Sequence, residues 1–133
     1  MKVTHLSLEQ ILAFQADSIR RHGGSGGIRD MGLIESALAQ PKVTFGGEEL
    51  YPDLVGKAAA LAYSFAKNHG FIDGNKRIAL ASLDMFLRVN DHKLDASIEV
   101  VVNTILAVAS SEMDRETFTT WVRDNTVPLN TEH

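Results

Sequence analysis

Apolar residues recur at intervals of three and four positions along almost the whole chain, and this spacing constrains the fold more than any other feature. Such intervals place apolar side chains on one face of an α-helix, whereas a half-buried strand needs strict alternation. Start signals divide the periodic stretches into six predicted helices. The helices begin at or just after Ser7, Asp30, Pro52, Gly74, Ser97 and Asp114. We therefore predict an all-α helical bundle.

The third and fourth predicted helices have the broadest apolar surfaces. The third carries many alanines between Leu54 and Phe65, and the fourth is apolar on more than one side between Ile78 and Leu87. A helix that is apolar around most of its circumference is buried in the interior of a protein. We expect these two helices to lie at the centre of the bundle.

The length of 133 residues is that of one domain, and we assign residues 1–133 to a single compact unit. Glycines are concentrated within 23–29, which is a connector or a mobile flap over a site. A turn-rich stretch at 41–51, before the third helix, is a short hairpin or a loop and a second candidate flap. Residues 126–133 follow the last predicted helix as a C-terminal tail.

The charge balance excludes several classes of protein. Thirteen basic and 17 acidic residues give a net charge of -4, so direct nucleic-acid binding through a broadly basic surface is not expected. The chain has no cysteine, which excludes disulfides and thiolate-bound zinc. No window approaches the roughly 18 apolar residues of a membrane span, and no secretory signal is recognisable at the N-terminus. We expect a cytoplasmic protein that does not enter the membrane.

One loop between the two central helices departs from this acidic background. It reads His69-Gly-Phe-Ile-Asp-Gly-Asn-Lys-Arg77. Between Lys57 and Arg77 the chain has four basic residues and one acidic residue, which is a local charge of +3. We interpret residues 69–77 as the active-site loop.

The second half of this loop has the properties of an anion site. Gly74 permits a tight turn and a close approach of a ligand to the backbone. The N–H groups of Asn75, Lys76 and Arg77 are unpaired donors at a helix start, where phosphates commonly bind. Two cationic side chains strengthen this attraction. As a plain alternative, Lys76 and Arg77 form a solvated helix start.

The first half of the loop offers a metal ligand and a base. Asp73 is a single hard oxygen ligand, which suits Mg²⁺ shared with phosphates and water. Histidine is the residue type that most often serves as a general base at neutral pH, so His69 can act as one. Simpler roles stay open: Asp73 can cap the following helix and His69 can face the dipole of the preceding one. We interpret Phe71 and Ile72 as core residues.

The loop resembles the signature H-x-F-x-[D/E]-[G/A]-N-[G/K]-R of the Fic/Doc superfamily, and Lys76 places it with the Doc (death-on-curing) branch. The resemblance extends to segments 27–41, 50–52 and 57–61. It implies the compact helical Fic fold and a toxin of a toxin–antitoxin module that modifies a protein hydroxyl.

The resemblance also implies roles for individual residues. In such enzymes the histidine deprotonates the target hydroxyl, the acidic residue holds Mg²⁺, and the asparagine and arginine bind phosphates. By position these roles fall on His69, Asp73, Asn75 and Arg77.

Two departures from the AMP-transferring relatives bear on the reaction. Lys76 stands where they carry glycine, and Leu80 stands where they carry a second arginine. The resemblance then implies a protein serine/threonine kinase that transfers the γ-phosphate of Mg·ATP, with elongation factor Tu as a plausible target and growth arrest as the result. Adenylylation and a non-catalytic partner-binding protein are the alternatives. Arg29 is a candidate contact of the flap with the target, or a salt bridge at a helix start.

The expected partner is a small Phd-like antitoxin. An inhibitory helix of the pattern [S/T]-x-x-x-E-[G/N] is not expected within the chain, because its nearest match, Thr44 to Glu48, is followed by Glu49. Inhibition is therefore expected from a separate chain that folds into a groove on the toxin. We expect an acidic residue of that antitoxin near Arg77 or Lys76.

Overall fold

Side-chain caps begin the helices largely as the sequence predicts. In the computed structural model, which describes residues 2–130, Ser7 and Gln10 form both hydrogen bonds of a capping box. The third helix is capped by Asp53, one residue after the predicted Pro52. The six helices are α1 (Leu8–His22), α2 (Met31–Ala39), α3 (Leu54–Asn68), α4 (Asn75–Val89), α5 (Ile98–Ala109) and α6 (Arg115–Asp124). The predicted all-α fold is confirmed.

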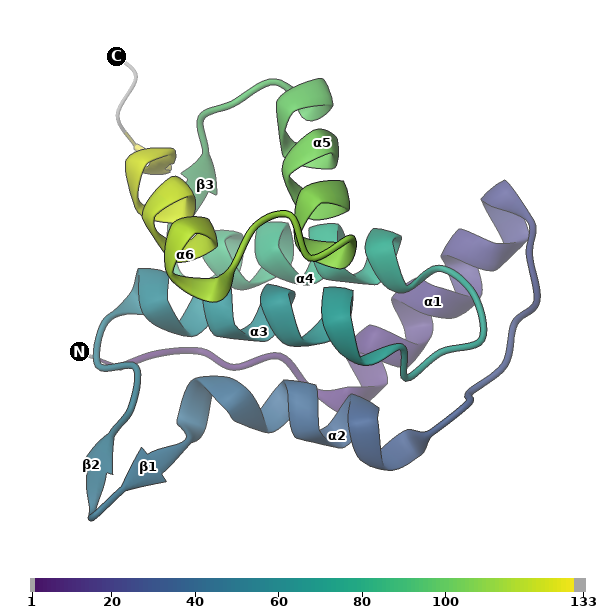
Figure 1. Cartoon of the computed structure of the whole chain (residues 1–133), viewed down its shortest axis with the longest axis horizontal. Coiled ribbons are helices and arrows are strands. Elements are labelled where there is room, and N and C mark those ends of the chain that lie inside the picture. Colours follow the sequence, from purple (N-terminus) through teal and green to yellow (C-terminus); the bar gives the residue numbers. More distant parts are fainter. Residues whose placement is uncertain (1, 131–133) are drawn as a thin grey trace.

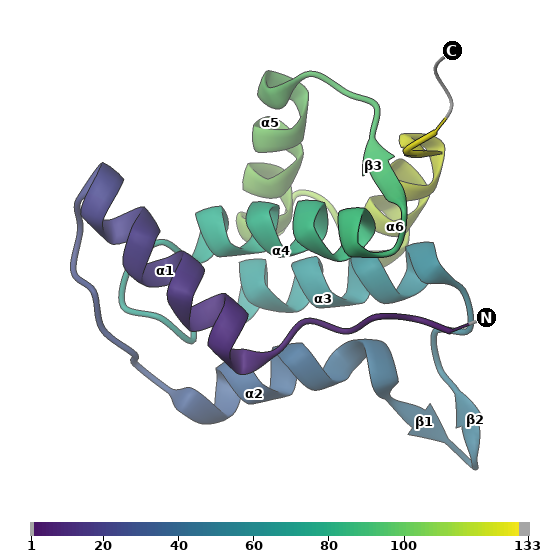
Figure 2. The same cartoon turned by 180° about the vertical axis from the view of Figure 1, so that it is seen from behind.

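The central position of α3 and α4 is also confirmed. These two helices pack side by side, α2 and α6 pack against α3, and α1 crosses behind α4 (Figures 1 and 2). Alanines of α3, among them Ala58 and Ala62, are fully buried and allow the close approach. Phe65 of α3 and Phe86 of α4 fill the centre of the core. None of the helices within residues 2–130 is long and apolar enough to cross a membrane.

Short strands complete the fold. A 3₁₀ turn, Gln40–Lys42, leads into β1 (Thr44–Phe45), which pairs antiparallel with β2 (Glu48–Glu49). This hairpin is one of the two forms expected for 41–51. A second antiparallel pair, β3 (His92–Leu94) with β4 (Thr126–Pro128), is not predicted from the sequence.

The first residues of the expected C-terminal tail, 126–133, form the strand β4. Its residues pair with β3, where His92 faces Pro128 and Leu94 faces Thr126. The end of the expected tail, 131–133, lies outside the described residues.

The two candidate flaps lie at opposite ends of the molecule. Segment 23–29 runs beside the active-site loop, because Ile28 bridges Phe71 and the Ile72 N–H donates to the Gly27 carbonyl at 3.0 Å. The β1–β2 hairpin protrudes near the N-terminal end of α3, whereas the loop follows its C-terminal end (Figure 1). The structure therefore does not place 41–51 over the loop.

Candidate active site

His69 lies at the C-cap of α3 in a left-handed conformation, with φ 53° and ψ 48°. This conformation is uncommon for a residue with a side chain, and it turns the chain sharply out of the helix. The Arg29 side chain stabilises the turn: its Nε donates to the His69 carbonyl at 2.8 Å and its Nη2 to the Asn68 carbonyl at 3.4 Å. The imidazole of His69 stays exposed to solvent.

Arg29 therefore acts on the backbone that carries His69. Its guanidinium satisfies carbonyl groups that the end of α3 leaves without intrahelical partners. Its backbone N–H also donates to the Gly70 carbonyl at 2.9 Å. The structure thus joins the end of the flap segment to the first residues of the loop, a role that neither sequence interpretation of Arg29 described.

Asn75 clamps the loop from within. Its Oδ1 accepts from the Phe71 N–H at 3.0 Å, and its Nδ2 donates to the Phe71 carbonyl at 2.9 Å. Both ends of the side-chain amide are thus used inside the loop, and the second N–H of Nδ2 and the backbone N–H of Asn75 are the donors that could meet a phosphate. Phe71 is 1% exposed and belongs to the core as predicted.

Ile72 does not belong to the core, and that prediction is wrong. Its side chain is 53% exposed and lies over Gly27. A Cβ atom on Gly27 would come within 2.6 Å of Ile72 Cδ1, so the glycine permits the contact. The flap segment and the loop therefore touch through an apolar side chain as well as through backbone hydrogen bonds.

Gly74 is the N-cap residue of α4, so the helix begins without a side-chain cap. It has φ 85° and ψ 13°, a left-handed conformation that suits glycine. The alternative role of Asp73 as the helix cap is wrong, because Gly74 is the N-cap residue and no side chain hydrogen-bonds the first turn. Asp73 Oδ2 instead accepts from the Ser25 N–H at 2.8 Å. The first turn of α4 stays open to an anion, and the Lys76 and Arg77 side chains beside it are exposed.

Two buried polar residues of α1 form the back wall of the loop, and the sequence analysis missed both. Gln15 Nε2 donates to the Asp73 carbonyl at 2.6 Å, and Arg77 Nη1 donates to Ser18 Oγ at 3.1 Å. Gln15 is 5% exposed and Ser18 4%. The available signal was their spacing: with Ile11 they occupy positions i, i+4 and i+7, which form one helix face.

A cleft of about 240 Å³ opens beside Arg77, between α1 and α4. Arg21 and His22 at the end of α1 line it, together with Leu80. The one carboxylate in its lining, Asp17, pairs with Arg21 at 2.9 Å. The cleft therefore presents basic groups from two helices to a ligand on the open end of α4.

Lys57 does not contribute to this charge, although the count over the sequence included it. It lies in the first turn of α3, is 3% exposed, and binds Glu49 Oε1 at 2.7 Å and the Tyr51 carbonyl. The hydrogen bond and charge of Lys57 hold the pKa of Glu49 below its usual range. Lys67 is likewise engaged, with Ser111 Oγ.

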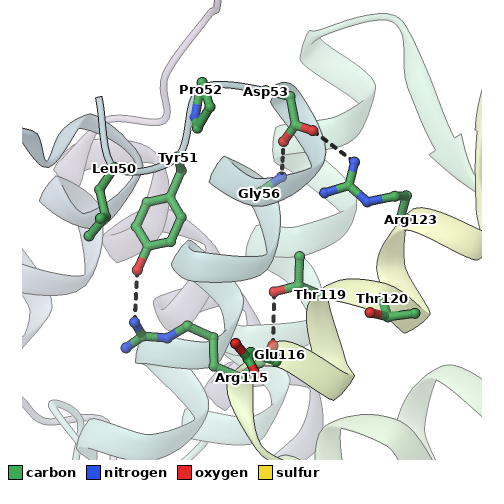
Figure 3. A pocket seen from close by; sticks show the side chains of 10 residues that line it. All are labelled: Leu50, Tyr51, Pro52, Asp53, Gly56, Arg115, Glu116, Thr119, Thr120 and Arg123. Carbon is green, nitrogen blue, oxygen red and sulfur yellow. Dashed lines mark hydrogen bonds and ion pairs between the residues drawn. The ribbon is translucent and has the colours of Figure 1, made fainter. Parts of the chain in front are cut away.

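A larger cavity lies away from the loop. It measures about 870 Å³ and separates residues 50–56 from α6 (Figure 3). Arg115 donates to the Tyr51 hydroxyl at 2.9 Å, and Arg123 pairs with Asp53 at 2.7 Å. Burial raises the pKa of Asp53, but hydrogen bonds from Arg123 and the Gly56 N–H outweigh it and leave the pKa below its usual value. No residue of the loop lines this cavity, so its size does not identify the reaction site.

The donor set at the loop fits a metal held mainly by its substrate. No group of three or more histidine, aspartate or glutamate side chains comes together within residues 2–130. Asp73 would be a single protein ligand, and its Oδ2 lies next to the backbone of Gly24 and Ser25. Mg²⁺ accepts such a site, because it commonly keeps its waters and binds one or two carboxylates together with phosphate oxygens.

Comparisons with known proteins match the same region. The model of the Fic/DOC family matches residues 5–87, which include the whole loop. Toxin Doc of Mycolicibacterium smegmatis is 46% identical over 78 residues, covering 59% of this chain and 60% of that toxin, which is less than two thirds of its length. Protein kinase doc of Escherichia phage P1 is 34% identical over 101 residues, covering 76% of this chain and 79% of the phage protein.

Proposed function

Since this chain belongs to the Fic/DOC family, we propose that it is the toxin of a toxin–antitoxin module and phosphorylates a serine or threonine hydroxyl of a host protein with Mg·ATP. The observation that carries this proposal is the uncapped N-terminus of α4, with a base, a carboxylate and two cations around it in one loop. One relative is named a toxin and another a protein kinase, which supports the same reading.

The proposed reaction starts at His69. Its exposed imidazole takes the proton of the target hydroxyl while the hydroxyl oxygen forms a bond to the γ-phosphorus. The bond between that phosphorus and the oxygen bridging to the β-phosphate breaks, and ADP leaves with the electron pair. When bound, Mg²⁺ would neutralise charge on the phosphates, and Asp73 would hold it.

The open end of α4 stabilises the charge of the phosphates. Backbone N–H groups of its first turn point toward the ligand, and the Lys76 and Arg77 side chains add positive charge. Ser18 orients the Arg77 guanidinium from behind. The backbone N–H groups and the Arg77 guanidinium are therefore held in place before substrate binds, which is what electrostatic stabilisation of a transferred phosphoryl group requires.

Leu80 favours phosphate transfer over transfer of AMP. It lines the cleft beside Arg77 with an apolar side chain, so it cannot supply the second arginine that the AMP-transferring relatives carry there. Lys76 instead places its charge directly at the helix start. We propose elongation factor Tu as the target, which makes translation in the cytoplasm the process that stops.

An apolar surface for the antitoxin lies next to the same charges. Ile98, Val102 and Leu106 of α5 are exposed, and the last two border a small cavity that Lys76 and Arg77 also line. We propose that an amphipathic helix of a Phd-like antitoxin covers this surface. An acidic residue of that helix would face the two cations and block the phosphate site.

The deciding experiment incubates the protein with ATP, Mg²⁺ and host lysate, and measures the intact mass of modified proteins. The His69→Ala variant is the matched control, because an exposed side chain can be removed with little effect on folding. We expect a phosphate on a target with the wild type and none with the variant. A target that gains AMP refutes the kinase step. If cells expressing the wild type grow as normally as cells expressing the variant, and no modified protein is found, the enzymatic function is refuted.

A further inference from the structure

The buried face of α1 changes character where it passes the active-site loop. Ile11 is buried among apolar residues, but Gln15, one turn later, buries a carboxamide. Its Nε2 donates to the Asp73 carbonyl, while its Oε1 is buried and finds no partner within residues 2–130. A buried unpaired carbonyl destabilises the folded state, and a methionine would fill the same space without it. The hydrogen bond from Gln15 to the Asp73 carbonyl must therefore have a role other than filling space in the core.

The backbone that Gln15 holds has two possible orientations. Gly74, with φ 85° and ψ 13°, matches the third residue of a type II β-turn, which has φ near +80° and ψ near 0°. In a type I turn the same residue has φ near -90°. The two turns interconvert by rotation of the central peptide, which here joins Asp73 to Gly74.

This peptide decides what α4 presents to a ligand. The carbonyl and N–H of a trans peptide point in opposite directions. Because the Asp73 carbonyl points at Gln15, the Gly74 N–H points away from α1. After a flip, the Asp73 carbonyl would point away from α1 instead, and an electronegative oxygen would replace a donor beside the open helix start.

We propose that Gln15 is a positioning residue that holds the Asp73–Gly74 peptide in the orientation that accepts an anion. The inference rests on the proposed function for the identity of the anion, the phosphates of ATP. The orientation itself is a property of the ligand-free chain. Gln15 also packs against Gly74, because a Cβ atom there would lie 3.1 Å from Gln15 Oε1, and so it closes the space behind the turn.

The test compares the wild type with Gln15→Met, and Gln10→Met serves as the matched control. The control makes the same substitution on the same helix and also removes a hydrogen bond, from the Ser7 N–H to Gln10 Oε1 at 2.7 Å, but it lies far from the loop. Gln15→Met keeps the volume and removes the unpaired carbonyl, so the variant is expected to fold.

Two measurements on the full chain separate this inference from the proposed function. Without ligand, the nuclear Overhauser effect between Asp73 Hα and the Gly74 N–H proton is strong in a type II turn and weak in type I. We expect it to be strong in the wild type and in Gln10→Met, and weaker in Gln15→Met. The second measurement is calorimetric binding of a non-hydrolysable ATP analogue with Mg²⁺, which we expect Gln15→Met to weaken about fivefold, the equivalent of one net hydrogen bond.

Each result has one meaning. An unchanged Overhauser effect in Gln15→Met overturns the inference, and so does unchanged affinity for the analogue. A wild type that binds no nucleotide refutes the proposed function, whereas the Overhauser effect still decides the role of Gln15. Thermal denaturation of all three proteins shows how much each substitution lowers general stability. If Gln10→Met loses affinity for the ATP analogue as Gln15→Met does, the loss reflects general stability and the inference fails.

Discussion

The substitution Asn75→Ala separates two roles of the same side chain. The sequence resemblance assigns the Asn75 amide to phosphate, whereas the structure uses both of its ends on the Phe71 backbone, at 3.0 Å and 2.9 Å. Alanine removes both hydrogen bonds and leaves the backbone N–H in place. The variant should therefore lose stability even when no nucleotide is present.

The expected magnitude follows from the two contacts. Each net hydrogen bond contributes about 0.5–1.5 kcal/mol, so their loss costs about 2 kcal/mol of unfolding free energy. A domain of this size loses roughly 4 °C in Tm for each kcal/mol, which predicts a fall of about 8 °C. Asn75→Asp should not restore the wild-type Tm, because it keeps the acceptor for the Phe71 N–H but sets a carboxylate oxygen against the Phe71 carbonyl.

Thermal and chemical denaturation without ligand measure these differences. Asn103→Ala is the matched control, since Asn103 is exposed on α5 and its replacement should leave Tm within a degree or two. The reasoning is refuted if Asn75→Ala has the same Tm as the wild type. If its affinity for Mg·ATP nevertheless falls, the amide binds phosphate directly and the clamp has little energetic weight.

Two further predictions concern the surroundings of the loop. Gly70→Ala places a Cβ atom 2.7 Å from Ile34 Cγ1 and 3.2 Å from the Ile34 nitrogen, and should lower the unfolding free energy by about 1–3 kcal/mol; an unchanged midpoint in urea would contradict this packing. Glu49→Gln should make the unfolding free energy depend less steeply on pH in the acid range. Lys57 lowers the folded-state pKa of Glu49, so its contribution is present above the ordinary value of 4.5 and is lost as the pH falls through the lower folded value. Equal slopes below about pH 5 in both proteins would argue against the contact.

Most of the fold could be predicted because the signals for helices are local. Ser7 and Gln10 are three positions apart, and their capping box forms as the sequence indicates. The pair β3–β4 could not be predicted in this way. Its strands have three residues each and come from segments that are more than 30 positions apart, 92–94 and 126–128, so neither shows a periodicity of its own.

The candidate site could be predicted only as far as it is contiguous. Residues 69–77 form one run, and the sequence alone identifies them as a group. The side chains that fix their geometry come from earlier elements: Gln15 holds Asp73 from 58 positions away, Ser18 holds Arg77 from 59, and Arg29 holds the His69 carbonyl from 40. No spacing rule connects residues at such distances.

The charge near the loop could not be predicted from the sequence either, because residues close in sequence can be far apart in the fold. Lys57 precedes His69 by only 12 positions, yet α3, with 15 residues, is about 22 Å long and places the two at opposite ends. Lys57 is also buried and paired with Glu49 Oε1 at 2.7 Å, so its charge is largely offset there and contributes little to phosphate binding at the other end of α3. Arg21 and His22 are far from the loop in sequence but line the cleft beside Arg77. A net charge of -4 is therefore compatible with an anion site, because only the charges within a screening length of the α4 N-terminus determine its potential.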